Sequence, residues 1–245
     1  ARPRANLARN PRRVTADPGQ TILQVALAHG IDIPRLCHDP RLTPTGACRL
    51  CVVEIDGQRG LHTACTRLAE PGMAVKTETE TVVRSRTSTL ELLLSEHNVS
   101  CTTCDADGAC LLQDYAYRYQ AREGRFPTLA TASQTTESYT AGHKGIVYDP
   151  SKCVRCQRCV KICAEVEMAE ALTMKGRALD VQVSTAFDLP LNDTTCEICG
   201  LCVSTCPTGA LAERAARGEG RAKDLKKVRT TCAYCGVGCQ IDLNV

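Results

Sequence analysis

The spacing of its cysteines constrains this chain more than any other feature. Of 245 residues, 18 are cysteine. They fall into five groups with none left over: Cys37, Cys48, Cys51 and Cys65; Cys101, Cys104 and Cys110; Cys153, Cys156, Cys159 and Cys163; Cys196, Cys199, Cys202 and Cys206; and Cys232, Cys235 and Cys239. Every group contains a C-x2-C pair, which is typical of metal and cluster sites rather than of disulfides. Because thiolates must stay reduced to bind iron, we expect a cytoplasmic protein.

The third and fourth groups share the spacing C-x2-C-x2-C-x3-C and form an internal repeat. This spacing is typical of bacterial ferredoxins with two [4Fe–4S] clusters, in which the last cysteine of each run binds the other cluster. The alternative is zinc, but zinc motifs use separated pairs. The exchange predicts two ligand sets, which are Cys153, Cys156, Cys159 and Cys206, and Cys163, Cys196, Cys199 and Cys202.

The first group has the spacing C-x10-C-x2-C-x13-C. It is similar to a plant-type [2Fe–2S] site with a longer gap between the first two ligands. We therefore expect one [2Fe–2S] cluster, with a zinc site in a small β-domain as the alternative. The predicted ligands are Cys37, Cys48, Cys51 and Cys65.

Local signals around the first group predict one helix and one hairpin. Thr21 and Gln24 can form a capping box for a helix over 22–29, and Gly30 is suited to end it. Asp56-Gly57 predicts a two-residue turn that would bring Cys65 back towards Cys51. One helix, short strands and a ligand loop are what a β-grasp ferredoxin needs.

The second group has three cysteines and lacks a fourth ligand of that type. His97 lies four positions before Cys101, and imidazole can replace thiolate as an iron ligand, as Rieske centres show. Losing one thiolate charge should raise the reduction potential of the cluster. The predicted [4Fe–4S] ligands are His97, Cys101, Cys104 and Cys110. The alternatives for the fourth ligand are His38, Asp105 and Asp107.

The fifth group lies in the stretch TCAYCGVGC, which has the spacing C-x2-C-x3-C. A cube usually takes four ligands. We expect Cys232, Cys235 and Cys239 to hold part of a further [4Fe–4S] cluster whose fourth ligand lies beyond Val245. If the chain ends there, the triad is either an incomplete three-ligand site or is completed by a partner.

The predicted fold class is α+β, with helices over 82–97, 111–122 and 165–172 and a hairpin over 178–187. Three alternating tyrosines in the second helix cannot share one face, so we expect only some to be buried. The predicted division is a basic tail (1–12), a [2Fe–2S] domain (13–79), a helical His/Cys cluster domain (80–125), a Ser/Thr-rich surface linker (126–145), a two-[4Fe–4S] domain (146–212), a solvated charged connector (213–230) and the start of a pterin-enzyme domain (231–245).

Several function classes are excluded by composition and motif. The net charge of +3 is too close to neutral to indicate nucleic-acid binding. No apolar run reaches the length of a membrane span, and no Gly-rich phosphate loop is present. The connector carries seven Lys and Arg residues, which leaves a docking surface for an acidic partner as the alternative to a solvated segment.

The order of these groups resembles the N-terminal region of three related families. They are the catalytic subunits of cytosolic NAD(P)-linked formate dehydrogenases, iron-only hydrogenases, and the large iron–sulfur subunit of complex I. TCAYCGVGC looks like the start of molybdenum or tungsten bis-pterin enzymes. Together with the paired ferredoxin runs, this stretch favours formate dehydrogenase.

By this resemblance, electrons would move between formate or carbon dioxide at a Mo/W-pterin site and a flavin- and NAD(P)-binding diaphorase subunit of a multi-subunit complex. The pterin site would lie beyond Val245, so these residues would carry electron transfer and no catalytic residue. The alternatives are a relay subunit of a multi-subunit hydrogenase or complex I relative, and a zinc-rich scaffold.

Overall fold

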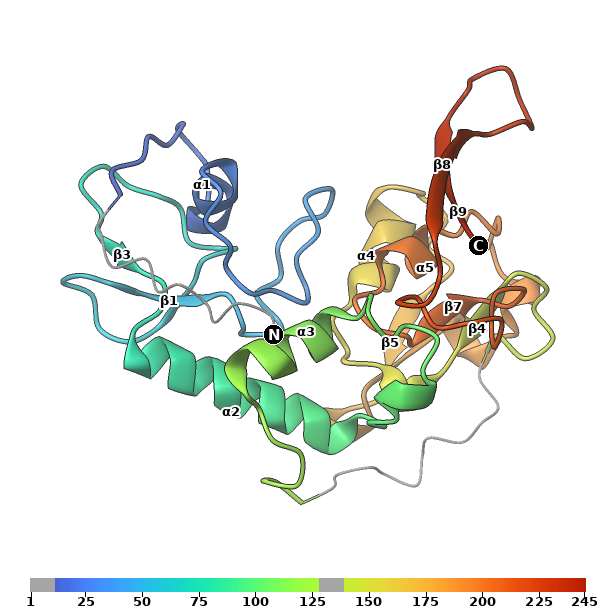
Figure 1. Cartoon of the computed structure of the whole chain (residues 1–245), viewed down its shortest axis with the longest axis horizontal. Coiled ribbons are helices and arrows are strands. Elements are labelled where there is room, and N and C mark those ends of the chain that lie inside the picture. Colours follow the sequence, from blue (N-terminus) through green and yellow to red (C-terminus); the bar gives the residue numbers. More distant parts are fainter. Residues whose placement is uncertain (1–11, 128–138) are drawn as a thin grey trace.

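The computed structural model describes residues 12–127 and 139–245 (Figure 1). The predicted tail, apart from Arg12, and much of the predicted linker lie outside these ranges. The described chain mixes short helices with small antiparallel sheets, as the sequence predicted. None of its helices is long and apolar enough to cross a bilayer. Short 3-10 helices lie at Cys101–Thr103, Pro150–Lys152, Ala178–Asp180, Ala186–Asp188 and Leu191–Asp193.

The first module packs helix α1 (Ile22–Ala28) against a three-stranded sheet. The predicted capping box is confirmed, because the Thr21 amide donates to Gln24 Oε1 at 2.8 Å and the Gln24 amide donates to Thr21 Oγ1 at 3.3 Å. The strand order is β2 (His62–Thr63), β1 (Val52–Ile55), β3 (Val75–Lys76). Apolar residues of α1 and β1 form the core between helix and sheet.

The predicted two-residue hairpin at Asp56-Gly57 is wrong in length. The Gln58 amide donates to the Ile55 carbonyl at 3.0 Å, so a tight turn does form there. However, the end of β1 pairs with β3, and β2 begins only at His62. The expected return of the chain is confirmed, since the Ala64 amide donates to the Cys51 carbonyl at 3.0 Å.

Two helices follow and pack against each other, α2 (Glu80–Glu96) and α3 (Leu111–Tyr119). The Thr79 hydroxyl caps α2 by accepting from the Val82 amide at 3.2 Å. Both predicted helices are confirmed, with small changes at their ends. Tyr115 and Tyr119 are four residues apart on one face and are buried, whereas Tyr117 is 71% exposed.

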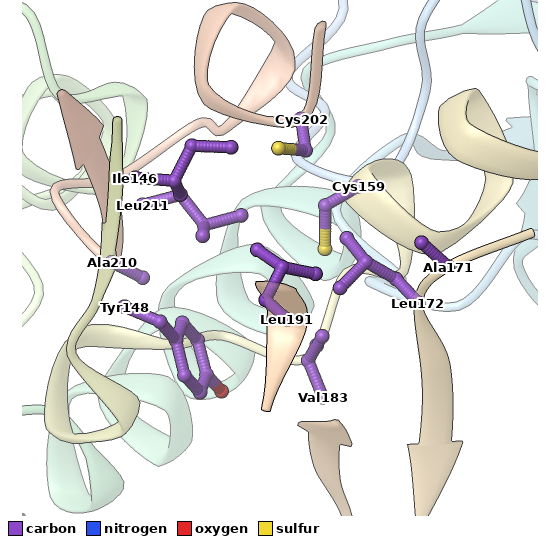
Figure 2. Close-up of a cluster of buried hydrophobic side chains, with 10 residues drawn as sticks. All are labelled: Ile146, Tyr148, Cys159, Ala171, Leu172, Val183, Leu191, Cys202, Ala210 and Leu211. Atoms are coloured by element: carbon purple, nitrogen blue, oxygen red, sulfur yellow. The ribbon is translucent and has the colours of Figure 1, made fainter. Parts of the chain in front are cut away.

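The second module, residues 139–213, contains two pairs of strands and two short helices. The pairs are β4 (Ile146–Tyr148) with β7 (Leu211–Glu213), and β5 (Thr173–Lys175) with β6 (Gln182–Ser184). The helices are α4 (Arg158–Glu165) and α5 (Leu201–Thr205). Figure 2 shows one cysteine from each helix, Cys159 and Cys202, among the apolar side chains of this core.

The predicted helix over 165–172 is wrong. The helix lies earlier, and α4 ends at Glu165 because the amides of Ala169 and Glu170 turn back to the Cys163 carbonyl, at 3.0 and 3.3 Å. Met168 adopts a left-handed conformation with φ of 61°, which a helix cannot contain. A hairpin follows as predicted, but it begins earlier than expected. Its first strand is β5, which lies before the predicted range of 178–187, and only its second strand, β6, lies inside that range.

The described end of the predicted surface linker, residues 139–145, is exposed at three positions and anchored in the second module at others. Thr140 and His143 are each 1% exposed. Tyr139 stacks on Tyr148 with ring centroids 5.1 Å apart. Arg214 donates to the Thr140 carbonyl at 2.9 Å, so the first residue past β7 holds this segment against the second module.

Beyond the connector, β8 (Lys227–Thr231) and β9 (Gln240–Asn244) form an antiparallel hairpin that projects from the second module (Figure 1).

Candidate metal centres

The four cysteines of the first group converge. The Cys48 amide donates to Cys37 Sγ at 3.4 Å, and the Leu36 amide donates to Cys48 Sγ at 3.4 Å. Side-chain hydrogen bonds link Cys37 to both Cys48 and Cys65, and Cys51 to Cys65. Loop 37–51 and the start of the segment after β2 therefore bring all four sulfurs to one place.

The pKa values of these thiols diverge because their sulfurs share hydrogen bonds. Donation from Cys48 and Cys65 holds the pKa of Cys37 far below its usual range. The same bonds raise the pKa values of Cys48 and Cys65, and donation from Cys65 lowers the pKa of Cys51 to about 7. This set of four cysteines, three of them buried and two of them accepting from backbone amides, fits a [2Fe–2S] cluster.

His97 lies at the C-terminal end of α2, where its amide donates to the Leu94 carbonyl at 3.3 Å. Its Nδ1 atom is buried and has no hydrogen-bond partner among the described residues. Burial lowers the pKa of His97, and the charge of Lys152 lowers it further. A neutral imidazole with a buried unpartnered nitrogen fits the ligand role.

Cys101, Cys104 and Cys110 lie around one short loop. The Cys104 amide donates to the Cys101 carbonyl at 3.2 Å. Burial raises the pKa of Cys110 to about 11, and the charges of Cys104 and Cys101 add to this rise. Gly209 lies against one of these thiols, because a Cβ on that glycine would be only 3.1 Å from Cys104 Sγ. The absence of a side chain at Gly209 therefore leaves space for this sulfur.

The two carboxylate alternatives to His97 are engaged elsewhere. Asp107 Oδ2 pairs with Lys223 Nζ at 2.5 Å, and Asp107 Oδ1 accepts from Gln113 Nε2 at 2.8 Å. Asp105 Oδ1 accepts from the Gly218 amide at 3.3 Å. The third alternative, His38, adjoins Cys37 of the first group, and burial, above all, lowers its pKa.

The charged connector is docked on this loop, although most of its residues are exposed. The Ala222 amide donates to the Asp105 carbonyl and the Lys223 amide to the Asp107 carbonyl, both at 2.8 Å. A Cβ on Gly108 would lie 2.5 Å from the Lys223 Cβ. The acidic residues that the connector contacts therefore belong to the same chain, while most of the connector stays exposed to solvent.

The structure brings the two ferredoxin runs together in one core. Cys159 and Cys202 are buried in it, and Cys153, Cys163, Cys196 and Cys206 pack against it. Arg158 Nε donates to Thr205 Oγ1 at 3.0 Å, which places the residues that precede Cys159 and Cys206 side by side. This packing is compatible with the exchanged arrangement that two cubes require.

Burial dominates the acid–base properties of these thiols. It raises the pKa values of Cys156 and Cys202 to about 12 each and that of Cys159 well above its usual value. Two buried phenol oxygens without hydrogen-bond partners in the described ranges, those of Tyr139 and Tyr148, belong to the same core. Burial raises the pKa values of both tyrosines, and the charges of Cys153 and Cys159 raise them further. Both rings pack in the core that contains these two cysteines.

The fifth group lies at the tip of the β8–β9 hairpin, where the Cys232 amide donates to the Cys239 carbonyl at 2.8 Å. Cys235 and Cys239 are exposed. Tyr234, which lies between Cys232 and Cys235 in the sequence, is 96% exposed. Over residues 12–127 and 139–245, no three His, Cys, Asp or Glu side chains surround one point as the ligands of a single metal ion would.

One polar cluster was missed from the sequence. The Asp39 carboxylate accepts from Arg41, from Thr205 at 2.9 Å and from Arg158 at 3.1 Å. Bonds from Arg41 above all, then from Thr205 and Arg158, hold the pKa of Asp39 well below its usual range. Asp39 and Arg158 are 119 residues apart, and no local spacing pattern pairs them. The available signal was that both lie beside candidate ligands.

Four family models match successive parts of the chain. They are a 2Fe-2S iron-sulfur cluster binding domain (residues 4–80), the NADH-ubiquinone oxidoreductase-G iron-sulfur binding region (86–125), the ferredoxin-like domain of NADH-quinone oxidoreductase subunit 3 (144–212) and the molybdopterin oxidoreductase Fe4S4 domain (225–245).

Curated relatives share this region. The chain is 38% identical over 225 residues to an NADH-quinone oxidoreductase-G protein of Rhizobium meliloti, which covers 92% of this chain and 26% of that protein. It is 34% identical over 229 residues to the NADPH-Fe(3+) oxidoreductase subunit alpha of Geobacter sulfurreducens, and this match covers 94% of this chain and 26% of that protein. The chain thus spans about a quarter of the length of these relatives.

A solved structure is also similar. A chain of the NAD+-reducing [NiFe]-hydrogenase in its H2-reduced state superposes with a TM-score of 0.75 at 35% identity, covering 83% of this chain and 84% of that one. The arrangement of sites and these matches agree. The chain belongs to the NADH-quinone oxidoreductase-G/molybdopterin oxidoreductase family, and it corresponds to the N-terminal region of that family, which contains the [2Fe–2S] and [4Fe–4S] domains.

Proposed function

We propose that this chain is the electron-relay portion of a cytoplasmic formate dehydrogenase. It would carry electrons between a Mo- or W-pterin site for formate and carbon dioxide and a flavin-containing diaphorase subunit that reduces NAD(P). The observation that carries the relay role is the packing of both ferredoxin runs into one core, where Arg158 beside Cys159 donates to Thr205 beside Cys206 at 3.0 Å. A zinc scaffold has no use for the exchange of Cys163 and Cys206 that we propose, whereas two neighbouring cubes depend on it.

The predicted ligand sets remain part of this proposal. They supply one [2Fe–2S] cluster in a β-grasp domain, three [4Fe–4S] clusters, and part of a further [4Fe–4S] cluster at Cys232, Cys235 and Cys239. When bound, the clusters supply one-electron transfer. The residues of this chain hold them in fixed places, exclude water, and donate hydrogen bonds to sulfur, which are the means by which a protein tunes such centres.

The assignment to formate rests on the last hairpin. Residues 225–245 match the Fe4S4 domain of molybdopterin oxidoreductases, and two of the three cysteines at its tip, Cys235 and Cys239, are exposed, as a site shared with further protein would be. The second candidate is a relay subunit of a hydrogenase or a complex I relative. It is favoured by the similarity to an NADP-reducing hydrogenase subunit of Solidesulfovibrio fructosivorans, 38% identical over 80% of this chain and 34% of that protein.

Anaerobic reduction of the complete holo-complex separates the two candidates. The visible absorption of the clusters is followed after adding formate, hydrogen or NAD(P)H in separate samples. We expect formate and NAD(P)H to bleach the absorption and hydrogen to leave it unchanged. Bleaching by hydrogen without any response to formate would contradict the formate dehydrogenase proposal and favour the hydrogenase.

A further inference from the structure

The ligand loop of the first module is joined to the second module through a closed hydrogen-bond network. The Asp39 side chain is 4% exposed and accepts from Arg158 Nη2 at 3.1 Å and Thr205 Oγ1 at 2.9 Å. Arg158 Nε in turn donates to Thr205 Oγ1 at 3.0 Å. Each of the three side chains is therefore bonded to the other two, and a buried carboxylate is fully paired.

The network lies next to ligands of two different sites. Asp39 follows Cys37, of the [2Fe–2S] set, by two residues, whereas Arg158 immediately precedes Cys159 and Thr205 immediately precedes Cys206. Cys159 and Cys206 belong to the same [4Fe–4S] set. The network thus connects the backbone beside one cluster to the backbone beside another at two points.

A weaker link supports the same contact further along the loop. The Thr43 amide donates to Glu165 Oε2 at 2.8 Å, and Glu165 pairs with Lys161 at 2.7 Å. Arg158 and Glu165 are the first and last residues of α4, so the loop contacts both ends of this helix. Glu165 is 32% exposed, and exposed pairs contribute little, which leaves Asp39 as the main anchor.

We infer that Asp39 is a positioning residue that fixes the separation of the [2Fe–2S] cluster from the cube of Cys153, Cys156, Cys159 and Cys206. This inference rests on the proposed function, because it requires both clusters to be bound. Removing the Asp39 charge leaves the Arg158 guanidinium, 13% exposed, without its carboxylate. An unpaired buried charge is driven towards water, and the two modules would then be free to separate.

Arg41 provides a matched control. It pairs with the same carboxylate, with distances of 2.9 and 2.8 Å from its Nε and Nη2 atoms. However, it lies in the same loop as Asp39 and is 45% exposed. Replacing it changes the charge near Asp39 without cutting the connection between modules.

The test measures the magnetic coupling between the two reduced clusters by pulsed EPR in the complete holo-protein. The variants are Asp39→Asn, Arg158→Gln, their combination, and Thr205→Val as a milder break that keeps all charges. We expect Asp39→Asn and Arg158→Gln each to weaken the mean coupling at least about twofold, and the double variant to be no worse than either, because both cut one network. Thr205→Val should give a smaller loss, and Arg41→Gln should keep the wild-type coupling.

Unchanged coupling in Asp39→Asn with normal iron content would overturn the inference and leave the proposed function standing. An equal loss in Arg41→Gln, or additive losses in the double variant, would overturn it as well. Wild-type protein without iron–sulfur clusters would instead overturn the proposed function on which the inference depends.

Discussion

The guanidinium of Arg86 on α2 donates a hydrogen bond to the phenol oxygen of Tyr119 on α3 at 2.8 Å. The Arg86 side chain is fully buried and also donates to the carbonyls of Leu50 at 3.0 Å and Val52 at 2.8 Å. These carbonyls lie on either side of Cys51. One side chain therefore joins two helices to the segment that leads into β1 and carries Cys51, a proposed [2Fe–2S] ligand.

Replacing Arg86 should destabilise the chain more than any surface change. Arg86→Leu leaves the Leu50 and Val52 carbonyls unsatisfied and Glu78 without its 2.9 Å partner, so we expect a loss of about 3–5 kcal/mol. Chemical denaturation measures this loss. Arg118→Gln is the control, because Arg118 bonds the same Glu78 carboxylate but is 27% exposed, and it should cost less than about 1 kcal/mol. Equal losses in the two variants would contradict this account of the buried guanidinium.

His97 should be required for its cluster. Its buried Nδ1 lacks a partner among the described residues, so we expect His97→Ala to lose the signal of one cube in EPR together with its iron. His97→Cys should retain a cube and lower its potential by more than about 100 mV, because a further negative ligand replaces a neutral one. Redox titration monitored by EPR measures both results.

His38→Ala is the matched control for that experiment, since His38 is also buried with an Nδ1 atom that has no partner in the described ranges. It should leave iron content and all cube signals in place. If His38→Ala removes the cube while His97→Ala keeps it, then His38 is the ligand and the assignment of His97 is wrong.

Tyr148 should tune the cube held by the first ferredoxin run. Its buried hydroxyl lies beside Cys153, and the pKa of the phenol is raised by burial first and then by the charge of that thiol. Donation to a cluster sulfur stabilises the reduced, more negative form, so Tyr148→Phe should lower the potential by roughly 40 mV, the one-electron equivalent of about 1 kcal/mol. The control Tyr117→Phe, 71% exposed, should leave it unchanged. No shift in Tyr148→Phe would show that this hydroxyl does not serve the cluster.

Stability of the second module should depend on His143 in mild acid. His143 Nδ1 accepts from the amides of Gly145 at 3.2 Å and Ile146 at 2.9 Å. Burial, and then the charge of Arg214, hold the pKa of His143 below its usual value. Its contribution is therefore present above about pH 6.5 and is lost as the pH falls through the lower folded pKa.

His143→Asn keeps an acceptor for these amides and cannot titrate. We expect thermal unfolding of the wild type to lose more stability than this variant between pH 7.5 and pH 5.5, and cluster loss in acid affects both equally. Parallel pH profiles for the two proteins would contradict the role given to His143.

Local sequence signals predicted the parts of this fold that depend on neighbours in the chain. The Thr21–Gln24 capping box, α2 and α3 follow from spacing alone. The helix expected over 165–172 failed because propensity was overridden by the Cys163 carbonyl, which accepts two later amides. The Asp39–Arg158 pair could not be predicted at all, since it depends on how two modules meet.

The cysteine groups were predictable for a different reason. Cluster ligands on one short turn need fixed spacings, so the sequence carries their geometry directly. The docking of the connector on Asp105 and Asp107 had no such signal, because basic and acidic stretches pair in many ways.

Metal and sulfide analysis of the complete, anaerobically purified protein tests the central claim most directly. One [2Fe–2S] and three [4Fe–4S] clusters predict about 14 iron atoms per chain with matching acid-labile sulfide, before any cluster at the final triad is counted. We expect this iron content, a brown colour, and separate EPR signals on stepwise reduction. Stoichiometric zinc with neither iron nor labile sulfide would contradict the account.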